Sequence, residues 1–485
     1  MLLIEVGNIR SQIVGSSYPY KEMEKKCSYF REGAQFSKAF CKGRWDGTIK
    51  LFRKGRFPTG LLSIVAGILK EHNIQFCLDF KVQFPEPKYN WELISVTPYQ
   101  DQIEAIQAAK KYRRGVLKLP TGSGKTAVVA CGIISEFGVD SLFVANQNIL
   151  IQQAKREFEK NISNCGTIGV IADGEVSIQS ITIASIQSLW SRRKDENVYK
   201  YLDNVGLIIV DEVQAVGTKM WKEIMNSCNA PYRFGLSATP TRVDNADLEI
   251  FACTGPVCYE SKASDMIEAD RLSDVKIEFV PYDHGLYNIS MRYPELYETQ
   301  IVDNEERNSL IVHETLKLLN EGRDILVLVQ RIKHGETLKQ MLIENNVQDV
   351  EFVFGNITGK LRERLIQDYK DGKFRVLIGS TIFDVGADLP RVSGLVLTGA
   401  GQSKIRALQR IGRAIRKWKD KKCALVIDIG DYNISYFEKQ AKNRKAQYIN
   451  EFGESRVITR EVHNSSQAKK LKGAHWTVKK MFELF

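Results

Sequence analysis

The sequence lacks the patterns that mark metal-bound, disulfide-linked or membrane-spanning proteins. Its nine cysteines contain no Cys-x-x-Cys pair, and its six histidines form no cluster. These absences argue against a zinc site and a disulfide framework, and they favour a reducing, cytoplasmic setting. No apolar run approaches the roughly 20 residues that a membrane helix requires. The N-terminal apolar run has no basic leader, so we expect no signal peptide.

The chain also lacks the biased composition of a disordered protein. Of its 485 residues, 43% are hydrophobic and 26% charged, which indicates a globular protein of about three domains. The net charge of +11 lies at the two ends. Residues 1–90 hold 15 basic and 8 acidic residues, and residues 433–485 hold 11 and 5. Two basic flanks predict a polyanionic partner, nucleic acid before membrane, with solubility alone as the alternative.

Local patterns divide the chain into a small α+β domain and two α/β blocks. Extended runs at 2–6, 10–14, 48–52 and 74–82, and helical runs at 19–30 and 60–72, make up the front domain. Two prolines in 84–88 predict an extended linker. Short apolar runs then alternate with helical stretches at 115–119, 141–145, 181–184, 206–210 and 233–236, and again at 325–329, 350–354, 375–378, 394–398 and 423–427. This alternation predicts two parallel sheets covered by helices on both faces.

The strongest local signal is a phosphate loop at 119–126, which reads Leu-Pro-Thr-Gly-Ser-Gly-Lys-Thr between a strand and a helical run. Its glycines allow successive N–H groups to surround an anion, and the following helix adds its positive end. Lys125 would reach the β- and γ-phosphates, and the Thr126 hydroxyl would hold Mg²⁺. A surface turn is the alternative. The nucleotide contacts predicted in this loop are Thr121, Gly122, Ser123, Gly124, Lys125 and Thr126.

Polar residues follow two further strands of the first block. Asp211 and Glu212 come directly after the apolar run 207–210. A buried parallel strand would deliver these carboxylates to the ligand-binding edge of its sheet. There Asp211 would hold the Mg²⁺ shell and Glu212 would orient or deprotonate the attacking water. Two solvated acids at a helix start are the alternative. The next strand ends in Ser237, Ala238 and Thr239, which we expect to sense the phosphate site.

A cluster of arginines lies in the second block. Helical spacing would put Gln409, Arg413 and Arg416 on one face, where guanidinium groups suit a developing phosphoryl charge. An exposed basic helix face is the alternative. Just before this cluster, residues 381–390 form a strand-end loop that contains Gly386 and Asp388.

These blocks, in this order, resemble the motor of superfamily 2 helicases and translocases over about residues 95–430. The resemblance implies two tandem RecA-like lobes, 89–258 and 259–432, between a nucleic-acid-binding domain at 1–88 and a basic, mostly helical extension at 433–485. It implies ATP and Mg²⁺ as cofactors, with the metal held through water by Thr126 and Asp211. Arginines Arg413 and Arg416 of the second lobe would complete the ATP site of the first, and Gln409 would join them.

The resemblance also assigns further residues. Tyr99 and Gln100 would contact the adenine, and Gly386 and Asp388 the nucleotide. Ser237, Ala238 and Thr239 would couple hydrolysis to movement. The strand contacts implied in the two lobes are Gln147, Ser185, Gln187, Gln330, Arg331 and Thr381. Gln214 stands where related families carry histidine; its amide could bridge to Ser237 or Gln409 and would not titrate near neutral pH.

The front domain narrows the resemblance. Residues 43–47 read Gly-Arg-Trp-Asp-Gly and are similar to the front domain of phage UvsW-like recombination helicases, which remodel forks, Holliday junctions and displacement loops. Arg307 and the Asp428 to Asp431 segment fit that group. Basic and aromatic residues interleave here as in nucleic-acid surfaces, although Trp45 and Phe57 would equally suit a domain core. The nucleic-acid contacts predicted in the front domain are Arg44, Trp45, Lys50, Arg53 and Lys54.

The sequence therefore predicts an ATP-dependent DNA helicase acting on branched or duplex DNA without sequence preference. An RNA–DNA hybrid is a further candidate substrate, a monomer is the expected state, and the compartment would be the host cytoplasm if the gene is phage-borne. Three alternatives stay open. They are a restriction-type duplex translocase that does not separate strands, an RNA helicase, and an ATP-independent nucleic-acid clamp.

Overall fold

The structure is a computed structural model that describes residues 1–466 except 217–218, 242–245, 286–290, 356, 381–388, 400–403, 419–420 and 422. The side chains of 404–406, 409 and 413 are also outside the description. The chain divides into two compact units, Met1–Ser261 and Lys262–Phe485. Within the described residues, no helix combines the length and apolar character needed to cross a membrane.

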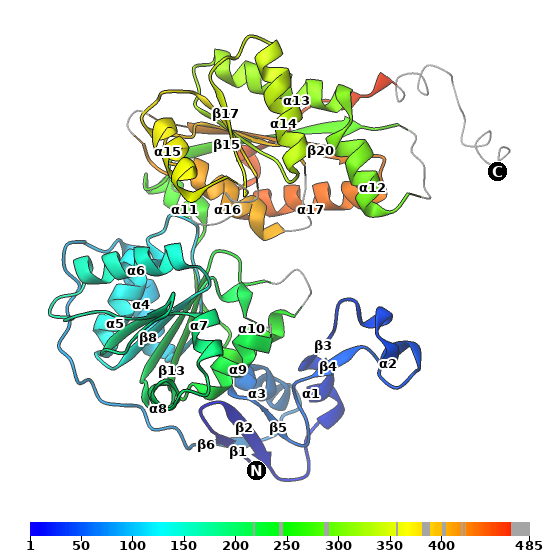
Figure 1. Ribbon diagram of the computed structural model, residues 1–485. Coiled ribbons are helices and arrows are strands. Elements are labelled where there is room, and N and C mark those ends of the chain that lie inside the picture. The colour runs from blue at the N-terminus through cyan, green and yellow to red at the C-terminus, as the bar shows by residue number, and fades with distance from the viewer. Residues whose placement is uncertain are drawn as a thin grey trace. The chain divides into compact units, whose positions relative to one another are not determined.

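The first unit begins with a four-stranded sheet in the order β5-β2-β1-β6 (Figure 1). Alternate residues of β1 are buried, and they pack with helices α1 and α3 in one core. The predicted helix at 19–30 is too long: it ends at Lys26, and Ser28–Phe30 forms a hairpin strand paired with Thr48–Lys50. The elements are β1 (Leu2–Val6), β2 (Arg10–Val14), α1 (Tyr20–Lys26), β3 (Ser28–Phe30), α2 (Lys38–Cys41), β4 (Thr48–Lys50), β5 (Arg56–Pro58), α3 (Leu62–Glu71) and β6 (Phe76–Phe80).

An eight-stranded sheet follows in the order β10-β9-β11-β8-β12-β13-β7-β14, and all its strand pairs are parallel except β10 with β9. Helices α4 to α6 pack on one face and α7 to α9 on the other, each over its own apolar core. The strands are β7 (Arg114–Lys118), β8 (Ser141–Ala145), β9 (Gly169–Ala172), β10 (Glu175–Ser177), β11 (Ile181–Ser185), β12 (Leu207–Asp211), β13 (Tyr232–Ser237) and β14 (Val257–Glu260). The helices are α4 (Gln100–Tyr112), α5 (Cys131–Phe137), α6 (Asn148–Asn161), α7 (Ile186–Ser191), α8 (Glu196–Asn204), α9 (Lys219–Ser227) and α10 (Asp247–Cys253).

The front sheet is docked tightly on this lobe through α10. A Cβ atom at Gly60 would lie 1.9 Å from the carbonyl oxygen of Phe251, so only glycine permits the approach of the two backbones. The Tyr29 hydroxyl donates to Glu249 of α10 at 2.7 Å, and Lys222 of α9 reaches the same carboxylate. The front domain and the first lobe therefore form one body.

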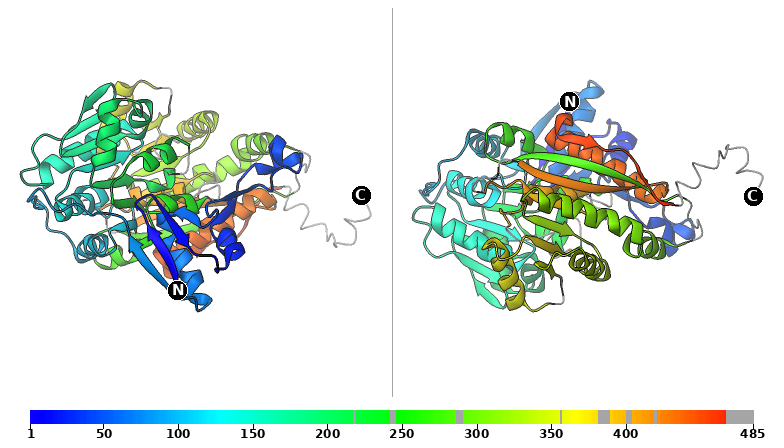
Figure 2. Two further views of the ribbon diagram at one scale, coloured as in Figure 1. Left: turned by 90° about the horizontal axis from the view of Figure 1, so that it is seen from below. Right: turned by 90° about the horizontal axis from the view of Figure 1, so that it is seen from above.

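The second unit is built on a wholly parallel sheet in the order β17-β18-β16-β19-β20-β15-β21, with β22 also beside β15. Strands β15 and β20 pair along ten residues and lie side by side in the right-hand view of Figure 2. Helices α13 and α14 pack on one face, and α11, α15, α16 and α17 on the other. The strands are β15 (Asp274–Asp283), β16 (Ile325–Leu328), β17 (Val350–Val353), β18 (Val376–Gly379), β19 (Gly394–Leu397), β20 (Cys423–Tyr432), β21 (Val457–Thr459) and β22 (His463–Asn464). The helices are α11 (Ala263–Glu268), α12 (Tyr293–Tyr297), α13 (Glu305–Asn320), α14 (Ile332–Glu344), α15 (Gly359–Lys370), α16 (Lys404–Ala414) and α17 (Ser435–Phe452).

The segment after residue 433 is part of this lobe as far as it is described. Its helix α17 packs on β20, where Arg444 forms a two-pronged ion pair with Asp428 at 2.9 and 2.7 Å. Strands β21 and β22 then extend the sheet, and the sequence had not indicated them. The rest of the basic extension, residues 467–485, lies outside the described residues.

Candidate nucleotide site and strand-contact loops

The phosphate loop follows β7, as the sequence predicts. Gly122 and Gly124 adopt φ angles of 88° and 77°, which residues with a side chain rarely take. A π-helical turn, Lys125–Ala130, begins immediately after Gly124 and leads into α5. The N–H groups of a first helical turn have no acceptor within the helix and remain available to an anion. The Lys125 ammonium lies 3.2 Å from the carbonyl oxygens of Leu119 and Pro120, so it is held over the same loop.

Gln102 braces this loop. Its amide nitrogen donates to the carbonyl of Ser123 at 2.7 Å, and its amide oxygen accepts the backbone N–H of Tyr99 at 2.8 Å. A Cβ atom at Gly124 would lie 2.8 Å from the same amide nitrogen. We had not assigned Gln102 a role, although a glutamine three residues after a helix-capping position is a recognisable capping signal.

The predicted adenine contacts lie beside this brace. Gln100 lies at the surface, where its amide donates to Glu104 at 3.1 Å, and the Tyr99 side chain is exposed. Their contact with a base therefore stays a prediction.

The predicted carboxylates lie at the same edge of the sheet. Asp211 is the last residue of β12, and Glu212 turns the chain through a left-handed conformation with φ of 50°. Burial, with a contribution from the neighbouring Glu212, raises the pKa of Asp211 to about 7, while the Lys125 charge acts in the opposite direction. Within the described chain, the positive charge near Asp211 is therefore too small to offset the cost of burying its ionised carboxylate.

A chain of hydrogen bonds joins the carboxylates to the end of β13. The Gln214 amide nitrogen donates to Glu212, and the Gln214 amide oxygen accepts from the Ser237 hydroxyl at 2.6 Å. The Ser237 hydroxyl in turn accepts the backbone N–H of Thr239 at 2.9 Å. The amide bridge to Ser237 that the sequence suggested is present. Its alternative partner, Gln409, has no described side chain.

These residues fit a magnesium–nucleotide complex. Strands β7, β13 and β12 are neighbours, so the phosphate loop, the hydroxyl segment and the carboxylates share one edge of the sheet. The buried hydroxyls of Ser123 and Thr239 have no hydrogen-bond partner within the described chain. Donors in the loop suit phosphate oxygens, and a cation at Asp211 would compensate its buried charge.

The predicted strand contacts of the first lobe follow the next strands of the sheet. Gln147 lies just after β8, and Ser185 ends β11, the neighbour of β8. The Ser185 hydroxyl accepts the N–H of Ser188, and the Gln187 amide donates to the carbonyl of Asn146 at 3.2 Å. The two loops therefore touch each other, on the part of the edge away from the phosphate loop.

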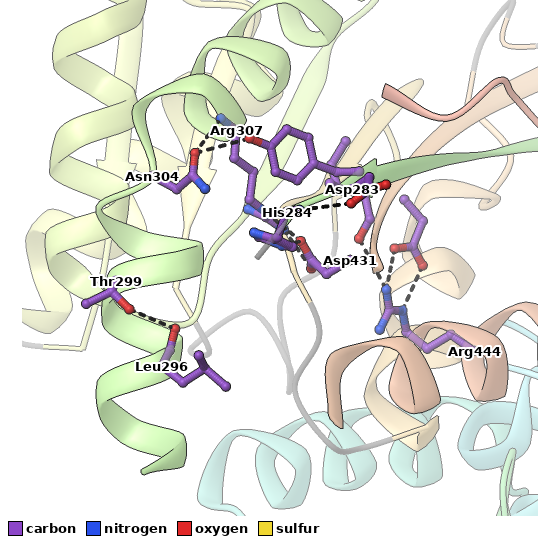
Figure 3. A network of polar contacts seen from close by, with 12 residues as sticks. Asp283, His284, Leu296, Thr299, Asn304, Arg307, Asp431 and Arg444 are labelled. Carbon is purple, nitrogen blue, oxygen red and sulfur yellow. Dashed lines mark hydrogen bonds and ion pairs between the residues drawn. The ribbon is translucent and has the colours of Figure 1, made fainter. Parts of the chain in front are cut away.

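In the second unit, Arg307 is the centre of a buried polar network (Figure 3). Its guanidinium donates to both carboxylate oxygens of Asp431, at 2.7 and 3.0 Å, and the His284 ring contacts the same carboxylate at 2.9 Å. Both members of the ion pair are nearly inaccessible to solvent. The pair joins the start of α13 to the end of β20, and these are the residues that the resemblance had singled out.

This network extends to the predicted strand contacts of the second lobe. His334, in the first turn of α14, bonds Asn308 at 2.9 Å. Gln330 and Arg331 immediately precede α14, and the Arg331 guanidinium lies 5.6 Å from the centre of the Tyr297 ring. Packing behind these two residues therefore fixes the start of α14.

The arginine cluster is described only in part. Helix α16 ends at Ala414, so Arg416 lies just beyond it, and the shared face of Arg413 and Arg416 stays a prediction. Lys421 donates a hydrogen bond to the carbonyl of Ala414, and Ser273 donates to the carbonyls of Ile415 and Arg416. These bonds accompany the end of the helix. The side chains of Gln409 and Arg413, and the whole of Thr381, Gly386 and Asp388, lie outside the described residues.

In the front domain, the aromatic residues divide between core and surface. Phe52 and Phe57 are buried, and their stacked rings lie 5.8 Å apart between centres. Phe57 is therefore a core residue, which was the alternative to nucleic-acid contact. Trp45 is half-buried, with its indole N–H donated to the carbonyl of Thr48 at 2.9 Å. The cations Arg44, Arg53 and Lys54 are exposed.

Comparisons with known proteins agree with this arrangement. Residues 95–242 match the family of type III restriction enzyme res subunits, and residues 307–417 match the helicase conserved C-terminal domain. The chain is 29% identical over 372 residues to the DNA 3'-5' translocase XPB2 of Sulfurisphaera tokodaii, across 69% of this chain and 82% of that relative. It is 22% identical over 468 residues to the ATP-dependent DNA helicase uvsW of Enterobacteria phage T4, across 89% and 90% of the two chains.

A solved structure shares the fold. The fragment of a putative HsdR subunit of a type I restriction enzyme from Vibrio vulnificus YJ016 is 20% identical, with a TM-score of 0.55 across 76% of this chain and 69% of that one. Both large sheets of the protein are accordingly RecA-like lobes. The motifs, the fold and these matches show that the chain belongs to superfamily 2 of the ATP-dependent helicases and translocases, with a UvsW-like helicase among its relatives.

Proposed function

We propose that the protein is an ATP-dependent DNA motor that remodels branched DNA such as forks, Holliday junctions and displacement loops. The observation that carries the motor is the hydrogen-bonded path from Glu212 through Gln214 to Ser237, beside a braced phosphate loop. Such a path links the group beside the reacting phosphate to a neighbouring strand end.

The first lobe supplies binding and orientation. N–H groups of the loop and the Lys125 ammonium would hold the phosphates of ATP, and Thr126 and Asp211 would hold Mg²⁺ through water. When bound, the metal would supply positive charge against the phosphate oxygens. Glu212 orients the attacking water, and Gln214 fixes the Glu212 carboxylate through its amide.

The second lobe completes the reaction in this proposal. Arg413 and Arg416 stabilise the charge of the transferred phosphoryl group, which can be worth about 10³–10⁵ in rate. Gln409 joins them, and Gly386 and Asp388 contact the nucleotide. Hydrolysis then depends on both lobes engaging the same DNA strand through Gln147, Ser185, Gln187, Gln330, Arg331 and Thr381.

One observation supports a branched substrate, and a second supports DNA as the nucleic acid. The front domain, which carries an excess of basic residues, is docked on the ATP-binding lobe and gives the motor a second place to hold DNA. The relative that matches 89% of this chain is named an ATP-dependent DNA helicase.

ATP turnover on a set of nucleic acids tests the proposal. We expect turnover to be highest with forks and four-way junctions, and lower with single strand, duplex and RNA–DNA hybrid. Lys125→Ala should reduce turnover to background on every substrate. Equal turnover by wild type and Lys125→Ala would exclude the motor and favour the clamp, and equal turnover on all DNA structures would exclude branched-DNA specificity.

A restriction-type duplex translocase is the second candidate. The family match over residues 95–242 and the HsdR-like fold favour it. A translocase that does not separate strands would displace a triplex-forming strand from duplex DNA without unwinding a fork, whereas the proposed helicase unwinds the fork.

A further inference from the structure

A hollow of about 660 Å³ in the front domain is lined by cationic side chains. They come from β2, from β4 and from the turn that leads into β5. No carboxylate belongs to the lining, and neither does any aromatic ring. The polar groups that line it are Arg10, Gln12, Lys50, Arg53, Lys54 and Arg56.

Most of these charges form no ion pair. Lys50 is paired with Glu24 at 2.9 Å, but Arg10, Arg53, Lys54 and Arg56 form no ion pair with any described residue. The Arg56 Nε–H donates to the Gln12 amide oxygen at 3.0 Å, so the amide nitrogen of Gln12 is left as a donor. The hollow therefore presents hydrogen-bond donors and several positive charges. These charges repel one another unless an anion lies between them.

The backbone of the turn is strained at one of these cations. Arg53 and Arg56 exchange both backbone hydrogen bonds at 2.9 Å, which makes residues 53–56 a two-residue hairpin turn. Its central residues, Lys54 and Gly55, have φ angles of 50° and 76°. Such turns favour asparagine or glycine at both central positions, and a lysine there is held in an unfavourable conformation. Strain of this kind is kept where the side chain has a function.

We propose that the hollow and its turn bind the sugar–phosphate backbone of a duplex DNA arm. This assignment rests on the proposed function and names a site for it. Several donors spread over two strands and a turn suit successive phosphates, which are contacted irrespective of sequence. The absence of aromatic rings from the lining removes base stacking, the means by which proteins hold single strands. The assignment therefore favours a duplex.

The site also separates the cations that the sequence had grouped together. Lys50, Arg53 and Lys54 line the hollow together with Arg56 of the same basic segment, and Arg10 of β2 joins them. Arg44 and Trp45 do not line it. Because the front domain and the first lobe form one body, a DNA arm in the hollow is fixed relative to the phosphate loop.

Binding of a labelled 30-base-pair duplex and of a 30-nucleotide single strand by the full chain, without nucleotide and over a range of salt, tests the site. We expect Lys54→Asn to weaken duplex binding about 3–10-fold at 0.1 M salt and to reduce the slope of log K against log salt by about 0.9, the loss of one phosphate contact. The same substitution relieves the turn, so thermal stability should stay equal or rise. A weaker binder that is at least as stable cannot be explained by misfolding.

The control is Lys38→Ala, which removes an exposed cation of α2 outside the hollow and should leave the slope unchanged. Unchanged duplex affinity in Lys54→Asn, or equal losses for duplex and single strand, would overturn the assignment. Displacement of the duplex by inorganic phosphate at constant ionic strength would reassign the hollow to a small anion. If Lys54→Asn reduces the slope as expected but ATP turnover shows no preference for branched DNA, the site stands and the proposed branched-DNA function is excluded.

Discussion

Gln214 shows how one side chain can tie two motifs together. Its amide donates to Glu212 and accepts from Ser237. An amide can make both bonds at once and does not titrate. We expect Gln214→Ala to lower DNA-stimulated ATP turnover about 10–100-fold, the usual loss when a side chain that orients a catalytic carboxylate is removed. Ser237→Ala should have a similar effect, and the double variant should lose little more than either single one, because the two side chains act in one path. Additive losses in steady-state turnover would show that they act separately.

Replacing this amide by histidine should add a pH dependence. The wild-type turnover should show no inflection near pH 6–7 that depends on this position, whereas Gln214→His should introduce one. A pH–rate profile of both proteins from pH 5.5 to 8.5 makes the comparison. A collapsed rate with an unchanged profile shape would contradict the bridging role.

His334 gives a second prediction at this scale. Burial and the nearby Arg307 charge lower the pKa of His334 to about 3 from its usual 6.5. The unfolded chain therefore takes up a proton between about pH 6.5 and 3 that the folded chain does not. The stability that depends on the neutral ring is present above pH 6.5 and is lost as the pH falls.

His334→Gln should flatten this loss, by up to about 1.4 kcal/mol per pH unit. Urea unfolding of both proteins at pH 4–7 measures the difference. His313→Gln, which changes an exposed histidine of α13, is the control. Parallel curves for wild type and His334→Gln would contradict the prediction.

At the scale of elements, strand β12 was predicted from its apolar run, and strand β15, which has no such run, was missed. Strand β12 is an unbroken apolar run and was expected within one residue of its bounds. Strand β15 alternates polar and apolar residues and contains Pro281, so it offered no such run, yet it pairs with β20 along its whole length. The phosphate loop and carboxylates follow predictable strands, which is why the first-lobe site could be foreseen. The hydrogen bond from Gln102 to the phosphate loop and the bend before Arg416 depend on tertiary contacts that spacing alone does not reveal.

The ion pair between Arg307 and Asp431 should decide how firmly α13 is held on β20. We expect Asp431→Asn to lower the free energy of unfolding of the second lobe by about 3–5 kcal/mol, because a buried guanidinium then loses its counter-charge. Glu321→Gln removes the partner of a solvent-exposed pair with Arg323 and should cost less than about 1 kcal/mol. Denaturant unfolding of the two variants tests the contrast, and equal costs would show that burial is not the source of the stabilisation.

For the molecule as a whole, the junction between the front domain and the first lobe should control cooperativity. Gly60→Val would push a side chain against the Phe251 carbonyl and separate the two backbones. We expect the front domain of the variant to unfold in a separate transition at lower temperature, whereas the whole unit of the wild type should unfold in a single transition. Differential scanning calorimetry distinguishes these cases; Gly67→Val is the control, since a Cβ atom there meets nothing within 4 Å. A single shared transition in Gly60→Val would contradict rigid docking.

The strand order of the second unit also bears on its synthesis. Among the described strands, its first strand, β15, pairs with β20, β21 and β22 alone, which the ribosome makes more than a hundred residues later. Until residues 457–464 emerge, the edge that they cover stays open, so this lobe cannot finish folding during most of its own translation. A nascent chain stalled before that point should expose this edge to chaperones, while the preceding unit is already complete.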